Sequence, residues 1–129
     1  MITYLENLAE HKKAADIVII GKGPSIDLIN TRCLESSIVI NLNDSELVFP
    51  GDLCIYRDQW VFDYFQKKPP KCGMYVSDKN INSDVPQLIL DYVPHTPESS
   101  QFMIERFFSE KAYIEQAIIV TALKIAEEI

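Results

Sequence analysis

The chain has 129 residues and a net charge of −7, with 47% hydrophobic and 24% charged residues. This length and composition predict one globular domain over residues 1–129, large enough for a core of about five strands with helices on both faces. The acidic balance argues against binding to nucleic-acid backbones, which depends on clustered cations. No segment approaches the run of about 18 uncharged apolar residues that a membrane span requires.

The N-terminus and the cysteines indicate the compartment. Residues 1–6 contain Glu6 and no basic residue, unlike a secretory signal, so a cytoplasmic location is expected. The three cysteines, Cys33, Cys54 and Cys72, are odd in number and include no Cys-x-x-Cys pair. We therefore expect reduced thiols, no metal site and no cofactor.

Hydrophobic periodicity and turn residues predict strands that alternate with helices along the chain. The expected helical segments are 2–13, 59–67, 100–109 and 112–127, with a short helix or turn at 25–30, and the expected strands are 16–20, 37–42, 53–57, 72–77 and 88–93. This alternation predicts an α/β fold, a three-layer Rossmann-like arrangement with a mostly parallel sheet of about five strands. We expect 16–20 to be the central strand, because Ile17 to Ile20 form an apolar run without a polar face.

The first strand leads into the turn Gly21-Lys22-Gly23-Pro24-Ser25. Gly21 and Gly23 allow positive φ and a close approach by a ligand, and Pro24 suits the first turn of a helix. Unpaired N–H groups at such a helix N-terminus favour a phosphate. The turn lacks the third glycine of the dinucleotide fingerprint and the Gly-Lys-Ser/Thr of a P-loop. It therefore predicts a different nucleotide-phosphate loop, or a strand-to-helix corner that binds nothing.

Polar residues also follow the next two strands. Asn41, Asn43 and Asp44 follow the second strand, and the sequence Tyr56-Arg57-Asp58 follows the third. Ligands bind beyond the carboxyl ends of parallel strands, so these residues are candidates for the rim of a nucleotide pocket. The alternatives are Asx turns at the asparagines and a helix N-cap at Asp58.

The remaining candidates are one histidine and two groups of aromatic residues. His95 lies in a loop between two prolines and is a weak candidate for a general base. Aromatic residues at helical spacing fit core faces better than a base-stacking platform; they are Trp60, Phe62, Tyr64, Phe65, Phe102, Phe107 and Phe108.

The segment over residues 16–60 resembles the bacterial sialyltransferases and the flagellin-modifying motility accessory factors. Their first strand is followed by Gly-Asn-Gly-Pro-Ser, which corresponds to residues 21–25 here. The similarity continues through 26–34, 38–43 and 53–58, and 120–126 is similar to a later apolar helix. The resemblance implies a nucleotide-sugar site, with a CMP-linked donor as the first guess, in which an asparagine after the second strand contacts the ribose or the base.

The chain departs from this family in three respects. Lys22 replaces the loop asparagine, and the stretch from Tyr113 to Gln116 lacks the small hydroxyl residues that open the family's later helix. The family's catalytic histidine and tyrosines come from a region that would follow residue 129. The resemblance thus implies a domain that is incomplete for catalysis alone.

These observations predict a small nucleotide- or nucleotide-sugar-binding domain, which would act as a glycosyltransferase if it is active. The alternative is a non-catalytic interaction module that keeps the Rossmann-like scaffold. Exposed apolar surface on the last helix, 118–129, would then favour self-association or a partner protein.

Overall fold

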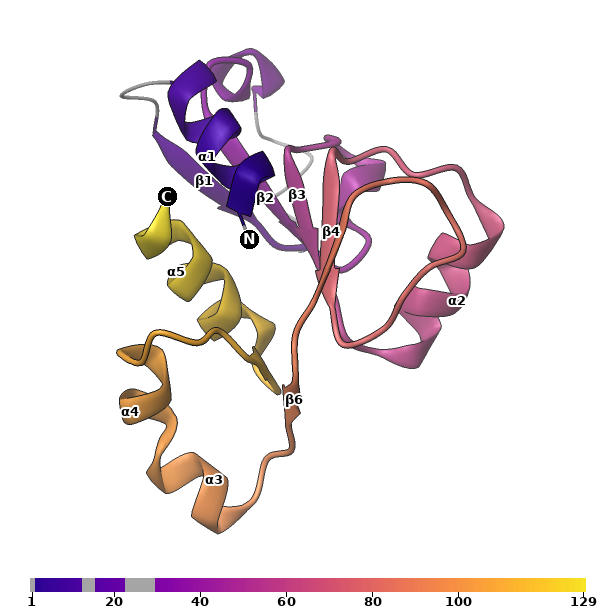
Figure 1. Cartoon of the computed structure of the whole chain (residues 1–129). Coiled ribbons are helices and arrows are strands. Elements are labelled where there is room, and N and C mark those ends of the chain that lie inside the picture. Colours follow the sequence, from indigo (N-terminus) through magenta and orange to yellow (C-terminus); the bar gives the residue numbers. More distant parts are fainter. Residues whose placement is uncertain (1, 13–15, 23–29) are drawn as a thin grey trace.

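The computed structural model describes residues 2–12, 16–22 and 30–129 and contains a five-stranded sheet (Figure 1). The sheet strands are β1 (Ile17–Ile20), β2 (Ile38–Leu42), β3 (Leu53–Ile55), β4 (Met74–Ser77) and β5 (Gln87–Ile89). All four neighbouring pairs are parallel, and the strands follow one another in chain order. The α/β, Rossmann-like prediction is therefore confirmed.

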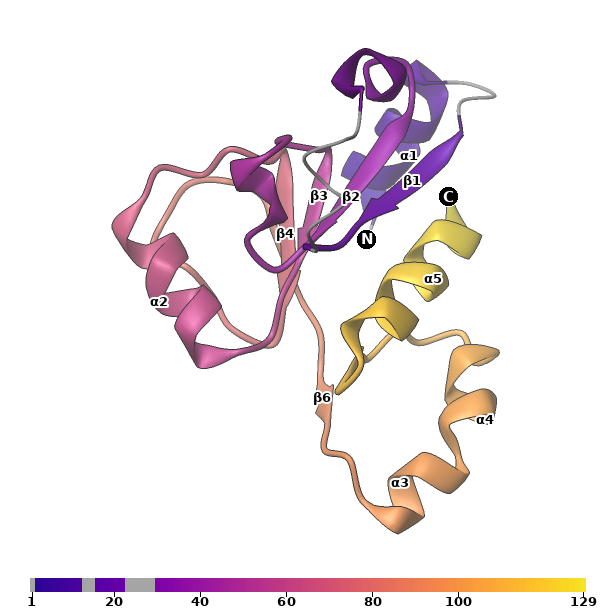
Figure 2. The ribbon, with the colours of Figure 1, turned by 180° about the vertical axis from the view of Figure 1, so that it is seen from behind.

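Helices lie on both faces of this sheet (Figures 1 and 2). The helical elements are α1 (Ile2–His11), η2 (Thr31–Leu34), η3 (Ser45–Leu47), α2 (Gln59–Lys67), α3 (Pro97–Gln101), α4 (Met103–Phe107) and α5 (Ile118–Glu128). Of these, α3 and α4 lie away from the five-stranded sheet. Parallel crossovers are almost always right-handed, so a sheet in chain order carries its connections on one face. The other face is left for α5.

Side-chain alternation along the strands divides the core in the same way. Ile40, Ile55 and Val76 belong to the cluster that packs on Ala122 and Ile125 of α5. The neighbouring positions point the other way: Cys54, Tyr56 and Tyr75 pack with Val61 and Phe65 of α2. A third cluster consists of Ile20, Leu34 and Val39. Burying each large apolar side chain stabilises the fold by roughly 1.5–3 kcal/mol.

The position expected for the first strand was wrong. β1 lies at an edge of the sheet, and β3 is the central strand. The three residues of β3 are fully buried, whereas Ile17, Val18 and Ile19 remain partly exposed. An apolar run indicates cover on both faces of a strand but does not say which strands lie beside it.

Two of the expected elements are divided in the structure. The single strand expected over 88–93 is two strands. β5 ends at Ile89, and Tyr92–Val93 form β6, which pairs with Ile114–Glu115 (β7) in a separate two-stranded sheet. The helix expected from 112 therefore begins only at Ile118. The Thr121 hydroxyl fixes this corner, because it accepts the Glu115 N–H at 2.9 Å and donates to the Tyr113 carbonyl at 2.8 Å.

The helix expected over 100–109 is also shifted and broken. α3 begins at Pro97, after a capping box in which Thr96 and Ser99 bond to each other's backbone N–H groups. Phe102 leaves helical geometry, with φ −105° and ψ 13°, and separates α3 from α4. Within the described part of the chain, no helix combines the length and the apolarity needed to cross a membrane.

Candidate functional site

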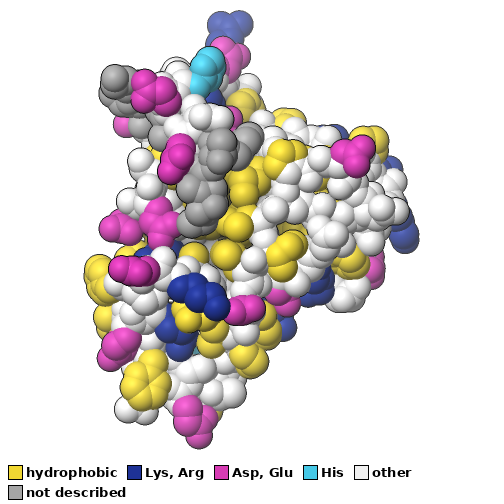
Figure 3. All heavy atoms as spheres, in the orientation of Figure 1, with side chains coloured by type: hydrophobic (Ala, Val, Ile, Leu, Met, Phe, Trp, Pro, Cys, Tyr) yellow, Lys and Arg dark blue, Asp and Glu magenta, His cyan; other side chains and the backbone are white. Residues whose placement is uncertain are grey.

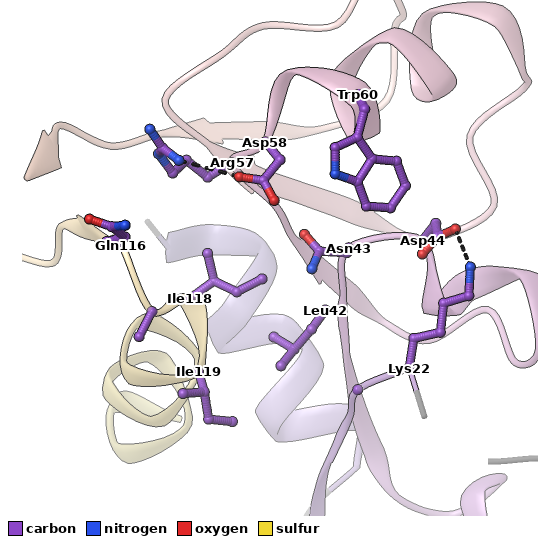
Figure 4. Close-up of a pocket in the computed structure, with 12 residues that line it drawn as sticks. Lys22, Leu42, Asn43, Asp44, Arg57, Asp58, Trp60, Gln116, Ile118 and Ile119 are labelled. Atoms are coloured by element: carbon purple, nitrogen blue, oxygen red, sulfur yellow. Dashed lines mark hydrogen bonds and ion pairs between the residues drawn. The ribbon is translucent and has the colours of Figure 1, made fainter. Parts of the chain in front are cut away.

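A pocket of about 530 Å³ lies beyond the carboxyl ends of β1, β2 and β3. The N-terminal ends of α2 and α5 complete its walls (Figure 4). Its lining residues are Gly21, Lys22, Leu42, Asn43, Asp44, Arg57, Asp58, Trp60, Gln116, Ala117, Ile118 and Ile119. The pocket thus lies where parallel α/β sheets bind their ligands.

Six residues that the sequence nominated line this one pocket. They are Gly21, Lys22, Asn43, Asp44, Arg57 and Asp58. Three further candidates, Gly23, Pro24 and Ser25, lie outside the described residues. Three separate strand ends therefore meet at one place, as the parallel arrangement requires.

Asn41 and Tyr56 do not line the pocket and are fully buried. The Asn41 amide donates to Ser45 Oγ and to the Phe49 carbonyl, both at 2.9 Å, and accepts the Gly51 N–H at 2.6 Å. It therefore fixes the connection from β2 to β3.

The Tyr56 ring lies edge-on to Phe65, with 5.0 Å between ring centroids. Burial raises the pKa of the Tyr56 hydroxyl to about 12, although a hydrogen bond with Ser77 acts in the opposite direction. Tyr56 is thus neutral near pH 7 and belongs to the core beneath α2.

Two ion pairs place both signs of charge in the pocket wall. Lys22 Nζ lies 2.8 Å from Asp44 Oδ2, and Arg57 Nη1 lies 3.3 Å from Asp58 Oδ1. Asp44 Oδ1 and Arg57 Nε are the buried side-chain atoms that have no hydrogen-bond partner among the described residues. Leaving a buried polar group unpaired costs roughly 1–3 kcal/mol, so both groups retain capacity for a further partner.

Asp58 occupies the N-cap position of α2, but its side chain makes no capping hydrogen bond. The alternative that Asp58 acts as a side-chain cap is therefore wrong. The carboxylate instead contacts Arg57 and lines the pocket. Arg57 also makes a cation–π contact with Tyr92, because its guanidinium carbon lies 4.1 Å from the centroid of the Tyr92 ring.

The backbone at two pocket residues differs in its conformational demands. Asn43 has φ 54°, in the left-handed region, which asparagine tolerates better than most residues. Gly21 does not have positive φ, and among the described residues, its two chain neighbours aside, no atom lies within 4 Å of the place where its Cβ would be. Gly21 therefore leaves open space beside the pocket, and the expectation that the turn needs its conformational freedom does not hold at this residue.

The N-terminus of α5 forms the opposite wall (Figure 4). Ala117 is its N-cap and provides no side-chain hydrogen bond, and the first turn contains no acidic residue. The first N–H groups of this 11-residue helix thus lack side-chain acceptors on their own element. Together with the helix dipole, they favour an anion.

Trp60 is the pocket residue that the sequence analysis misassigned. It was expected in the core of α2, but its side chain is 56% exposed at the pocket wall, while Val61 and Phe65 face the core. Residues 60 and 64 have the same four-residue spacing as residues 61 and 65, so the spacing alone does not show which pair faces the core. The signal that identifies Trp60 is its place in the first turn of a helix that directly follows a central strand.

His95 lies outside this pocket. It is exposed and lines a separate cavity of about 260 Å³, with its Nδ1 3.0 Å from Ser100 Oγ. That cavity shares Gln116 and Ala117 with the larger pocket. His95 is therefore next to the candidate site and is not part of its charged wall.

Comparisons of this chain with protein-family models, with curated proteins and with solved structures gave no significant match. The assignment of a function therefore depends on the geometry and chemistry of the pocket itself.

Proposed function

We propose that this pocket binds a nucleotide or a nucleotide sugar. The observation that carries the proposal is the convergence of Lys22, Arg57 and the uncapped N-terminus of α5 on one concave surface. Two cations and a helix N-terminus are suited to a phosphate or a diphosphate. The net charge of the chain is −7, and in this pocket wall the two cations balance the two carboxylates of Asp44 and Asp58.

The other lining residues match the remaining parts of a nucleotide. The exposed ring of Trp60 offers a face on which a base can stack. Asp44, Asp58 and Asn43 supply oxygens that accept hydrogen bonds from ribose or sugar hydroxyls. The two carboxylates repel a phosphate, so a phosphate must contact Lys22, Arg57 or the N-terminus of α5 without closely approaching Asp44 or Asp58.

Ligand binding is the direct test of this proposal. We expect thermal shift and calorimetry with CMP, UDP, GDP, ADP and a CMP-linked sugar to show at least one saturable ligand. Its dissociation constant should lie on the order of micromolar to millimolar, because a few exposed hydrogen bonds must offset the cost of association. If none of these compounds binds at millimolar concentration, the proposal is wrong.

A second candidate function is a non-catalytic interaction module. It is favoured by large apolar side chains that remain exposed on α3, α4 and the residues beside them, among them Phe102, Ile104 and Phe108, which is 77% exposed. These aromatics correct the expectation that Phe102 and Phe108 lie in the core. Acidic side chains, by contrast, are spread over the face seen in Figure 3 and form no single patch there.

Light scattering separates the two candidates. A chain that self-associates through this apolar surface should become monomeric when Phe108 and Ile104 are replaced by serine, whereas nucleotide binding should persist, because neither residue lines the pocket.

A further inference from the structure

Three chemically reactive side chains meet in the core between the sheet and α2, outside the pocket. Glu46 of η3 is 1% exposed, and Cys54 of β3 and Cys72, before β4, are also buried. A carboxylate oxygen of Glu46 and the two sulfur atoms all lie within 4.8 Å of one another. Cys72 Sγ is 3.9 Å from Glu46 Oε1. These groups interrupt what is otherwise an apolar and aromatic cluster.

The fold explains why residues so far apart in the sequence meet here. In the parallel pairing of β3 with β4, Cys54 is the register partner of Tyr75, and both side chains lie on the α2 face. The Tyr75 hydroxyl accepts the N–H groups of Lys71 and Cys72, which brings the segment before β4 back over this face. The same hydroxyl donates to Glu46 Oε1 at 2.5 Å.

A fourth donor adjoins these three side chains. Asn41 Oδ1 lies 3.4 Å from Cys72 Sγ and is held in place by the Gly51 N–H. Two sulfurs and a carboxylate oxygen thus lie close together in the core, with a second oxygen beside the Cys72 sulfur. Tetrahedral coordination of this kind suits zinc, which takes Cys sulfur at about 2.3 Å and carboxylate oxygen at about 2.0–2.2 Å. Two soft sulfur ligands disfavour magnesium and calcium.

We propose that Cys54, Cys72 and Glu46, with Asn41 Oδ1 as fourth ligand, form a structural zinc site. Binding replaces the S–H protons of both cysteines with Zn–S bonds, and the protons pass to solvent without any change of oxidation state. The S–H groups are otherwise directed to Asn41 Oδ1 and to the Asn43 carbonyl. Tyr75 and the Gly51 N–H would orient the oxygen ligands from outside the coordination sphere.

The electrostatics of the metal-free protein agree with this chemistry. Burial, followed by the neighbouring Cys72 thiol and the carboxylates of Glu46 and Asp44, raises the pKa of the Cys54 thiol well above its usual value. A divalent cation in the same place reverses the local preference and stabilises the thiolate.

The spacing of the cysteines in the sequence does not indicate such a site. Cys54 and Cys72 form no Cys-x-x-Cys motif, so the sequence analysis expected no metal. Only the lateral pairing of β3 with β4 and the position of η3 bring the ligands together. This proposal is independent of the nucleotide pocket.

Metal content tests the proposal. The full chain is produced with zinc in the medium and freed of loosely bound metal by gel filtration. Inductively coupled plasma mass spectrometry should then find one zinc per chain. Replacement by Co²⁺ should give a thiolate-to-cobalt charge-transfer band. Cys54→Ala and Cys72→Ala should lose both signals, and Cys33→Ser, which removes the third cysteine, should keep them.

Wild-type measurements keep the proposal testable even if a core variant fails to fold. Chelation of the wild-type protein should lower its Tm, and added zinc should restore it. The proposal is wrong if the purified chain holds no zinc and its Tm does not respond to zinc. A mass two daltons below that of the reduced chain, without metal, that persists in Cys33→Ser would show a Cys54–Cys72 disulfide instead and would overturn the proposal. Equal zinc loss in Cys33→Ser would show unspecific thiol binding.

Discussion

Lys22 Nζ lies 2.8 Å from Asp44 Oδ2, and this ion pair connects equivalent positions after two neighbouring strands. Lys22 is the second residue beyond β1, and Asp44 is the second residue beyond β2. The parallel register of Ile20 with Asn41 brings the two loops together. The lysine thus compensates a carboxylate that is buried in the pocket wall and that would otherwise repel a phosphate.

Replacing Lys22 by methionine should weaken nucleotide binding about ten- to a hundredfold. A hydrogen bond to a charged group contributes roughly 1.5–3 kcal/mol, and the variant also leaves Asp44 uncompensated. Calorimetry with the best ligand of the panel measures the loss. Lys111→Met is the matched control, because Lys111 pairs with Asp91 at an exposed site away from the pocket. Equal losses in both variants would show a general effect of charge.

Replacing Trp60 by alanine should reduce affinity for nucleotides and leave affinity for inorganic pyrophosphate unchanged. Stacking of a base on an aromatic side chain contributes about 1–3 kcal/mol, and pyrophosphate has no base. Stability should change little, because Trp60 is largely exposed. Trp60→Phe should retain most of the affinity. If pyrophosphate binding falls in parallel with nucleotide binding, Trp60 supports the shape of the pocket and does not stack on a base.

Replacing Gly51 by alanine should destabilise the fold by about 1–3 kcal/mol, as overpacking of a core does. The added Cβ would lie 2.5 Å from Asn41 Oδ1 and 2.7 Å from the Val39 carbonyl oxygen, and the latter belongs to a strand that cannot move aside. Gly21→Ala is the control, because its Cβ would enter open space. Urea denaturation compares the two variants. Equal stability of both would contradict the close packing at Gly51.

The Glu46→Gln variant should become more stable relative to the wild type as pH rises, in the presence of a chelator. Burial is the main cause that raises the pKa of Glu46 above its ordinary value of 4.5; the Tyr75 hydrogen bond and Lys71 oppose it, and Asp44 adds to it.

The folded state therefore holds this proton more tightly than the unfolded state. Its contribution to stability is complete below pH 4.5 and is lost as pH rises through the folded-state pKa. Glutamine does not titrate, so the difference between the two proteins changes by at most about 1.4 kcal/mol per pH unit in that range. Urea denaturation from pH 4 to 8 measures it, and a difference that stays constant with pH would contradict the burial of a titrating Glu46.

Much of the sheet could be predicted from local sequence because its strands are short apolar runs between turn residues. α2 begins and ends where expected, since Asp58 precedes it and Pro69-Pro70 cannot continue a helix. The edge position of β1 was not predictable in this way, because lateral order depends on contacts between distant segments. β7 is two residues long and carries no periodic signal of its own.

The candidate site shows the same division. The rule that ligands bind at strand carboxyl ends was sufficient to bring Gly21, Asn43 and Arg57 to one pocket. It could not exclude Asn41, because the direction of a side chain at the end of a strand depends on strand register. It also gave no information on Ala117, whose place in the pocket depends on how α5 docks across the sheet.

Because α5 forms one wall, the pocket is lined by residues from early and late parts of the sequence. Gly21 and Lys22 follow the first strand, whereas Ile118 and Ile119 begin the last helix. The pocket therefore assembles only after the last helix has docked, and a bound ligand must stabilise that docking by the free energy of binding. Amide exchange in α5 should slow as ligand saturates, while exchange in the β3–β4 ladder follows global unfolding. Ligand binding would thus depend on the docking of the last helix against the first strands, whereas a site formed by a single strand-to-helix turn would not.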